Sequence, residues 1–272
     1  MSKKKKLFVF DLDGTLLNSQ TKIDDANVKA LIQAREKGHV LAIATGRNYL
    51  FAKMVVQDHW NLFDYYLGCN AALFHDIKNK KYQQSSKNIS YQLVTYIINK
   101  LQTIGGGIQV STIWNVYAKI FLVYDDQAFI DGSKKAYFEN WESPESMSEK
   151  ERQLIVQVSL HVDHDVIKTV AQQLQEEFGQ MYDITITSRV NIDINLKGLN
   201  KLFGIKAIAE KEAISPDYVY VFGDSQNDHP GLEFYKNTYA VENGLEETKK
   251  IAKNVIGSHD TDAIAKVVLK NI

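Results

Sequence analysis

The sequence predicts an α/β protein in which a doubly wound parallel sheet is interrupted by a separate α+β domain. Short apolar runs alternate with helical patterns near both ends of the chain, as in parallel sheets covered on both faces by helices. This rhythm changes in the middle of the chain. Pairs of carboxylates follow two of the apolar runs, and functional sites of open α/β sheets form at the carboxyl ends of strands.

The first part of the chain reads as strand-helix-strand-helix-strand. Continuous apolar runs predict buried strands at residues 7–10, 40–44 and 65–68. Helical patterns cover residues 24–37 and 49–56. In the first helix, the side chains expected on one face are Val28, Leu31, Ile32 and Arg35, with Asp24 as N-cap and Gly38 as the C′ residue.

The middle of the chain, from about residue 80, predicts an α+β domain inserted into the first one. Apolar residues at 3–4 spacing predict a helix at 88–103, and the glycines 105–107 are expected to break the chain after it. The remaining predicted elements are strands at 108–113, 116–124, 153–160, 183–187 and 190–195, and helices at 126–138 and 165–178.

The earlier pattern resumes at Leu199 and continues to the last residue. Helices are predicted at 199–213, at 245–253 and from about 262, and strands at 218–222, 238–241 and 254–256. We therefore expect a core domain made of residues 1–82 and 193–272, and an inserted domain of residues 83–192.

Composition narrows the class of protein. The 272 residues are 44% hydrophobic with a net charge of −1, so no global charge favours nucleic acid or anionic membranes. No apolar run approaches the roughly 20 residues of a membrane helix, and the N-terminal lysines read as a solvated tail. The single cysteine, Cys69, excludes an internal disulfide. We expect a cytoplasmic protein, monomeric or weakly homo-oligomeric, without a nucleic-acid or membrane partner.

The segment Asp11-Leu12-Asp13-Gly14-Thr15 directly follows the first predicted strand. Two carboxylates so close together raise each other's pKa unless a cation lies between them. Magnesium prefers carboxylate oxygens and usually takes a phosphate oxygen as well. This segment therefore predicts a Mg²⁺ site that faces a phosphorylated substrate.

Three further segments are expected at the same edge of the sheet. Asp224 and Asp228 follow the strand at 218–222, although an N-cap plus a surface charge would also explain this pair. Thr45-Gly46-Arg47 follows the strand at 40–44 and suits a phosphate cradle. Thr45 would equally fit a helix cap, and Arg47 an ion pair. Lys201 adds positive charge, with Lys197 as its alternative.

These four segments, in this order, resemble the four motifs of the haloacid dehalogenase (HAD) superfamily. The chain is similar over nearly its whole length to the Cof-like sugar-phosphate phosphatases of that group, and the insert resembles the type IIB cap. The resemblance implies a Rossmann-like parallel-sheet core, a mobile cap that closes over the substrate, and Mg²⁺ as cofactor.

The resemblance also implies a role for each motif residue. Asp11 attacks phosphorus to form an aspartyl-phosphate. Asp13 protonates the leaving oxygen and then assists water. Thr45 and Lys201 bind the transferring phosphoryl oxygens. The acid at position 13 indicates phosphate esters whose leaving group must be protonated.

Metal and phosphate contacts are implied in the same way. The Asp11 carboxylate, the Asp13 carbonyl and Asp224 hold Mg²⁺, and Asp228 orients a metal-bound water. The residues expected around the phosphate are Leu12, Gly14, Gly46, Arg47 and Asn227, the last fixing Lys201 or its loop.

The sequence departs from the family pattern at Leu202, Ala71 and His229-Pro230-Gly231, and none of these positions carries a proposed catalytic atom. The expected activity is hydrolysis of small phosphorylated metabolites, sugar phosphates first. The alternatives are a phosphatase acting on flavin mononucleotide or pyridoxal phosphate, a phosphosugar mutase, and a non-catalytic phosphate-binding regulator.

Overall fold

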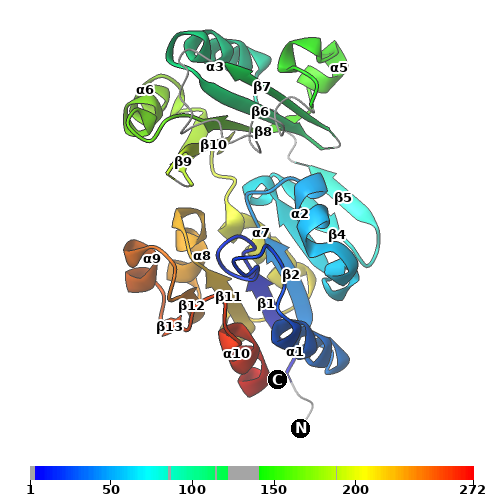
Figure 1. Cartoon of the computed structure of the whole chain (residues 1–272). Helices are drawn as coiled ribbons and strands as arrows, with labels where there is room; N and C mark the ends of the chain where they lie inside the picture. Colours follow the sequence, from blue (N-terminus) through cyan, green and yellow to red (C-terminus); the bar gives the residue numbers. More distant parts are fainter. Residues whose placement is uncertain (1–3, 85–86, 114, 122–140, 188) are drawn as a thin grey trace. The chain divides into compact units, whose positions relative to one another are not determined.

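The chain, described here by a computed structural model, divides into two compact units (Figure 1). Residues 1–83 and 199–272 form the core unit, and residues 84–198 form the inserted unit. The structure describes residues 4–84, 87–113, 115–121, 141–187 and 189–272. The second boundary lies six residues beyond the expected 192/193, because strand β10 (Asn191–Leu196) pairs with strands β8 (Ile155–His161) and β9 (Tyr182–Ile186) of the inserted unit.

The core unit is built on an eight-stranded sheet in the order β13-β12-β11-β1-β2-β3-β4-β5. The strands are β1 (Leu7–Phe10), β2 (Val40–Ala44), β3 (Tyr65–Gly68), β4 (Leu73–Asp76), β5 (Lys81–Gln84), β11 (Val219–Gly223), β12 (Asn237–Val241) and β13 (Asn254–Ile256). Strand β1 pairs in parallel with both β2 and β11, while β4 is antiparallel to β3. The predicted parallel sheet is confirmed, and β4 and β5 extend its edge beyond the prediction.

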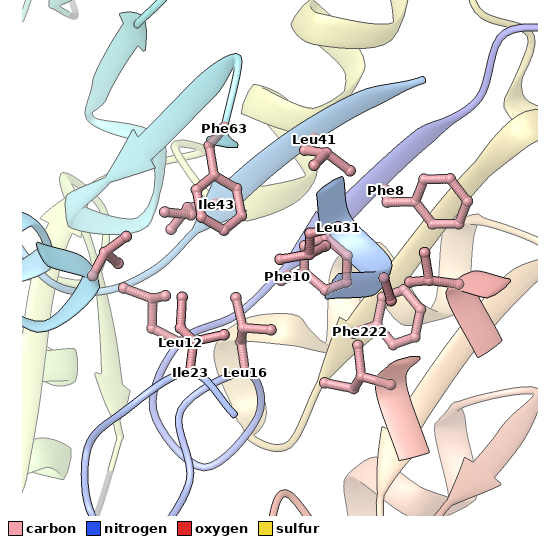
Figure 2. Packing of buried hydrophobic residues seen from close by; sticks show 14 of the residues in the cluster. Phe8, Phe10, Leu12, Leu16, Ile23, Leu31, Leu41, Ile43, Phe63 and Phe222 are labelled. Carbon is pink, nitrogen blue, oxygen red and sulfur yellow. The ribbon is translucent and has the colours of Figure 1, made fainter. Parts of the chain in front are cut away.

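Both faces of this sheet are buried. On one face Phe8, Phe10 and Phe222 pack with helix α1 (Asp25–Glu36), and Figure 2 shows Phe10 and Phe222 beside Leu31 of that helix. Alternate residues such as Val9 and Val221 belong to a second cluster on the opposite face. Because both faces are covered, the strands read as continuous apolar runs rather than alternating ones.

Six helices of the described residues flank the core sheet. They are α1, α2 (Tyr49–Val56), α7 (Lys201–Lys211), α8 (His229–Phe234), α9 (Glu246–Ile251) and α10 (Ala263–Asn271). The side chain of Asp24 caps α1 by accepting from the backbone N–H of Ala26, as predicted.

The buried face of α1 differs from the predicted one. It consists of Asn27, Ala30, Leu31 and Ala34, whereas Ile32 is 39% exposed. The polar Asn27 is buried because its side-chain oxygen accepts from the backbone N–H of Ala265 at the start of α10, 2.9 Å away.

The inserted unit has a five-stranded sheet in the order β7-β6-β8-β10-β9, with β6 (Gly106–Thr112) and β7 (Val116–Phe121). Its helices among the described residues are α3 (Tyr91–Ile104), α5 (Glu149–Arg152) and α6 (Ile167–Phe178). The predicted helix at 126–138 lies outside the described residues. No helix in the described ranges is long and apolar enough to cross a membrane.

The break that the sequence predicted at glycines 105–107 is confined to Gly105. Gly105 ends α3, but Gly106 and Gly107 begin β6 and pair with β7. Gly106 adopts a φ of +121°, and a Cβ there would lie 2.5 Å from the carbonyl oxygen of His161. Glycine is therefore needed at this position for a close strand contact rather than for a loop.

Candidate active site

The predicted site residues Asp11 and Asp224 lie at the same edge of the core sheet. Asp11 directly follows β1 and Asp224 directly follows β11, and the register pairs Phe10 with Phe222. The parallel pairing of these strands brings their carboxyl ends together, which is where open α/β sheets form their sites.

A buried lysine joins two of the carboxylates. Lys201, the first residue of α7, donates from Nζ to Asp11 Oδ1 and to Asp228 Oδ1, each at 2.7 Å. The alternative, Lys197, lies in the inserted unit and contacts Asp183 and the carbonyl of Gly179 instead. Of the two candidates, the structure therefore places Lys201 in this cluster.

Asp228 holds the loop after β11 in shape. Its second oxygen, Oδ2, accepts from the backbone N–H groups of Asp224 at 3.0 Å and Ser225 at 3.2 Å. Its side chain thus caps the 3-10 turn Gln226–Asp228, and it makes no capping bond at the start of α8. Asp228 therefore occupies the N-cap position that the alternative explanation assigned to this pair, but its side chain holds the backbone at Asp224 and Ser225 instead.

The cluster contains more negative than positive charge. The carboxylates of Asp11, Asp224 and Asp228 have oxygens within 4.8 Å of one another, and among the described residues only Lys201 contributes a cation hydrogen-bonded to them. Burial raises the pKa of Asp11 well above its usual range, partly offset by Lys201. Burial, reinforced by Asp228, raises the pKa of Asp224 to about 7.

This imbalance fits a divalent cation. Burial alone would lower the pKa of Lys201, but the charges of Asp11 and Asp228 outweigh it and raise that pKa. Lys201 is therefore fully charged, and the three carboxylates together exceed its charge. An all-oxygen donor set with excess negative charge is what Mg²⁺ prefers.

The loop after β1 makes room for Asp224. Gly14 adopts a φ of +74°, and a Cβ there would lie 2.8 Å from Asp224 Oδ2. Thr15 donates from its hydroxyl to Asp224 Oδ1 at 3.1 Å, and Asn243 donates to the carbonyl of Gly14 at 2.7 Å. Sequence reasoning assigned no role to Thr15 or Asn243, although Thr15 lies inside the first motif.

Asp13 and Arg47 form a two-pronged ion pair. Arg47 donates from Nε to Asp13 Oδ2 and from a terminal nitrogen to Asp13 Oδ1, both at 2.7 Å. The Asp13 side chain is 53% exposed, unlike that of buried Asp11. Of the two roles weighed for Arg47, this geometry provides the ion pair.

Thr45 is buried and does not cap the following helix. Its hydroxyl oxygen accepts from the backbone N–H of Arg47 at 3.2 Å, which leaves its own O–H available as a donor. The N-cap of α2 is Asn48, whose side chain accepts from Phe51 N–H. The capping explanation for Thr45 is therefore wrong, because Asn48 already fills that position.

Asn227 contacts its own loop and Asn70 rather than Lys201. It donates to Asn70 Oδ1 at 3.0 Å and accepts from the Ser225 hydroxyl at 2.9 Å. Residues 69–71 all adopt positive φ angles, between 49° and 74°, a costly conformation that persists only where the surroundings enforce it. Among the remaining predicted contacts, Leu12 has a fully buried side chain, so only its backbone can face a phosphate.

Comparison with known proteins matches this arrangement to one family. Residues 8–268 match the sequence model of haloacid dehalogenase-like hydrolases. The phosphatase YitU of Bacillus subtilis, named for 5-amino-6-(5-phospho-D-ribitylamino)uracil, is 23% identical over 98% of this chain and 97% of its own. The HMP-PP phosphatase of Yersinia enterocolitica is 22% identical over 90% of this chain and 86% of its own.

The fold has close counterparts among solved structures. The HAD subclass IIB sugar phosphatase BT4131 superposes with a TM-score of 0.79 at 22% sequence identity, covering 98% of this chain and 100% of that one. A structural likeness at 22% sequence identity supports the two-unit fold. The chemistry is argued from the residues described above.

Proposed function

Because the chain belongs to the family of haloacid dehalogenase-like hydrolases, we propose that it is a Mg²⁺-dependent phosphomonoesterase that hydrolyses small phosphorylated metabolites, sugar phosphates first. One observation carries this proposal: buried Lys201 bridges Asp11 and Asp228 at 2.7 Å each, beside the third carboxylate, Asp224.

Asp11 acts as the nucleophile in this proposal. Lys201 holds Oδ1, so Oδ2 is the oxygen that attacks phosphorus. The new bond joins this oxygen to phosphorus as the bond to the leaving oxygen breaks, giving an aspartyl-phosphate on Asp11. Water then attacks phosphorus, releases inorganic phosphate and regenerates the carboxylate.

Asp13 acts as the general acid and then as the general base in this proposal. It is exposed enough to meet a leaving group, donates a proton to the departing oxygen and takes one back from the attacking water. The O–H of Thr45 and the ammonium of Lys201 donate to phosphoryl oxygens, where negative charge is concentrated. Arg47 must release Asp13 for this chemistry, and the arriving phosphate provides an alternative partner for its guanidinium.

The metal would be held by the Asp11 carboxylate, the Asp13 carbonyl and Asp224. Mg²⁺ bound there supplies positive charge that offsets the repulsion between the Asp11 carboxylate and the substrate's phosphate. Asp228 fixes the backbone that presents Asp224.

The substrate class is supported by the relatives. YitU and the Yersinia enterocolitica enzyme are both named as phosphatases of small phosphorylated metabolites, and BT4131 as a sugar phosphatase. We propose that residues 84–198 form the domain that determines substrate specificity.

The test is phosphate release from a panel of sugar phosphates, flavin mononucleotide, pyridoxal phosphate and p-nitrophenyl phosphate, with and without Mg²⁺. Asp11→Asn should lower turnover by at least a thousandfold, because the neutral amide is a poor nucleophile. Asp58→Asn, the same substitution at an exposed aspartate, should keep wild-type turnover.

The products separate the alternatives. Free phosphate that requires both Mg²⁺ and Asp11 supports the phosphatase. An isomerised sugar phosphate without free phosphate would indicate a mutase. Binding without turnover by folded protein in Mg²⁺ would indicate a phosphate-binding regulator.

A further inference from the structure

The segment Cys69-Asn70-Ala71, directly after β3, has a strained backbone. Its three residues adopt positive φ angles of 49°, 54° and 74°, although none of them is a glycine. The segment is also buried, and Asn70 is only 5% exposed. Such a conformation costs free energy and persists only where the surrounding contacts enforce it, and it clusters at functional sites.

The backbone of this segment is bonded to the loop after β2. The N–H of Cys69 donates to the carbonyl of Arg47, and the N–H of Asn70 donates to the carbonyl of Thr45, each at 3.0 Å. The N–H of Thr45 donates in turn to the carbonyl of Leu67 in β3 at 2.9 Å. The strained segment therefore helps to fix the loop that carries Thr45.

The segment also packs on helix α7. A Cβ added at Gly204 would lie 2.8 Å from the Cβ of Ala71, so the methyl group of Ala71 lies directly against the backbone of this helix. Lys201 is the first residue of the same helix. The segment thus contacts two elements that carry site residues, the loop after β2 and α7.

The side chain of Asn70 reaches a third element, the turn after β11. Its Oδ1 accepts from Asn227 Nδ2 at 3.0 Å, and Asn227 Oδ1 accepts from the Ser225 hydroxyl at 2.9 Å. The amide of Asn227 is therefore held between Asn70 and its own turn. The same turn carries Asp224 and Asp228, which are joined by the bond from the Asp224 N–H to Asp228 Oδ2. Asn70 thus supplies a contact from outside the turn that presents these carboxylates.

This contact bears on the binding of a cation. Carboxylates that lie close together repel one another until a cation separates them, and this repulsion favours movement of the turn. A hydrogen bond from a neighbouring segment opposes that movement, and a preorganised site loses less freedom when it binds. Asparagine suits position 70 because it adopts a positive φ more readily than most residues and offers an amide oxygen as acceptor.

We propose that Asn70 is a positioning residue, which holds the turn at residues 224–228 through Asn227 and thereby sets the affinity of the site for Mg²⁺. The inference rests on the proposed function in placing Mg²⁺ beside Asp224. Its effect on Mg²⁺ binding is nevertheless measured without any substrate, so it is tested separately from the hydrolysis.

The experiment measures Mg²⁺ binding by isothermal titration calorimetry to full-length wild type and Asn70→Gly. Glycine keeps the backbone N–H and adopts a positive φ without strain, so the substitution removes the side-chain amide alone. Lys80→Gly is the matched control, because Lys80 is exposed and also has a positive φ, 53°. The dissociation constant for Mg²⁺ should rise about tenfold in Asn70→Gly, as for the loss of one hydrogen bond, and stay unchanged in Lys80→Gly.

The rate of hydrolysis separates a positioning role from a structural one. With p-nitrophenyl phosphate, the Mg²⁺ concentration that gives half the maximal rate should rise about tenfold in Asn70→Gly, while kcat at saturating Mg²⁺ stays within about twofold of wild type. Asn70→Asp keeps an oxygen that accepts from Asn227, so its affinity for Mg²⁺ should stay within about threefold of wild type. A loss of kcat that excess Mg²⁺ does not restore would overturn the proposal.

A double-mutant cycle tests the route through Asn227. Asn227→Ala should weaken Mg²⁺ binding at least as much as Asn70→Gly does. Adding Asn70→Gly to Asn227→Ala should change the dissociation constant by less than about twofold, because both substitutions remove the same bond. Fully additive effects would show that Asn70 acts by another route and would overturn the proposal. If Asn70→Gly does not fold, Asn227→Ala decides, and wild-type affinity for Mg²⁺ in that variant overturns the proposal.

Failure of the proposed function gives a different result. Wild type that binds Mg²⁺ but hydrolyses no phosphate ester would contradict the phosphatase, while the binding constants of the variants would still test Asn70. Absence of Mg²⁺ binding by wild type, or equal dissociation constants in wild type and Asn70→Gly, would overturn the role of Asn70 itself.

Discussion

At the scale of single residues, Lys201 is the buried cation that bonds to both Asp11 and Asp228. A buried charge that loses its partner is strongly destabilising. We predict that Lys201→Met lowers the free energy of unfolding of the metal-free protein by about 3 kcal/mol at pH 8, measured by urea denaturation. Lys29→Met, at an exposed position of α1, should change it by less than about 0.5 kcal/mol. Equal losses in the two variants would show that the buried pairs contribute nothing specific.

Asp224 makes the stability of the metal-free protein depend on pH. Burial, reinforced by Asp228, raises its pKa from 3.8 to about 7 in the folded chain. Between these two pH values the folded chain keeps a proton on Asp224 that the unfolded chain has lost. The stability that depends on this proton is fully present below about pH 4 and is lost as the pH rises through about 7.

We predict that Asp224→Asn stabilises the metal-free protein at pH 8 by about 1–3 kcal/mol, because it removes a charge whose burial is unfavourable. The gain should shrink as pH falls towards 4.5. Urea denaturation in the presence of a chelator at both pH values measures it. If the variant were less stable than wild type at pH 8, burial of the Asp224 charge would not be unfavourable in the folded protein.

At the scale of elements, Gly14 and Gly38 form a matched pair. Both have positive φ, +74° and +80°, but a Cβ at position 14 would meet Asp224 at 2.8 Å, while nothing lies within 4 Å of position 38. Gly38→Ala should cost about 1 kcal/mol of stability and no activity. Gly14→Ala should cost at least as much and lower kcat/KM at least tenfold. Equal activity in the two variants would show that the Asp224 contact is unimportant.

The elements also show where sequence reasoning succeeds. Strands such as β1 and β11 could be predicted because burial on both faces requires unbroken apolar runs. The strand β5 could not, since its Lys81-Tyr82-Gln83-Gln84 sequence has no apolar pattern. The prediction of the buried face of α1 was wrong because the contact between Asn27 and α10 is a tertiary contact, which leaves no signal in the local sequence.

In the candidate site, too, some residues could be predicted from the sequence and others could not. Asp11, Asp224 and Asp228 could be proposed because carboxylates are unusual directly after buried strands, and Lys201 by its position in the motif pattern that the chain resembles. The capping by Asn48 and the bond between Asn227 and Asn70 depend on loop geometry that no short motif encodes. Gln157 of β8 and Asn195 of β10 are visible in the sequence as polar residues, but only the structure shows that Gln157 Nε2 and Asn195 Oδ1 lack a hydrogen-bond partner among the described residues.

At the scale of the whole molecule, each unit has its own sheet, so each can be stabilised separately. A ligand that binds only the folded state stabilises it by about 2.7 kcal/mol at a hundred times its dissociation constant. Mg²⁺ should therefore slow amide hydrogen exchange by up to about a hundredfold in the core unit, at residues 11–17 and 223–228 above all.

The inserted unit provides the internal control for that measurement. Strands β6, β8 and β10 contain none of the proposed Mg²⁺ ligands, so their exchange should change little when Mg²⁺ is added. Asp224→Asn should abolish the protection in the core unit, because it removes one of the carboxylates proposed to hold the ion. Equal protection of both units would mean that they open as a single cooperative body, and the Mg²⁺ site would then be thermodynamically coupled to the stability of the inserted unit.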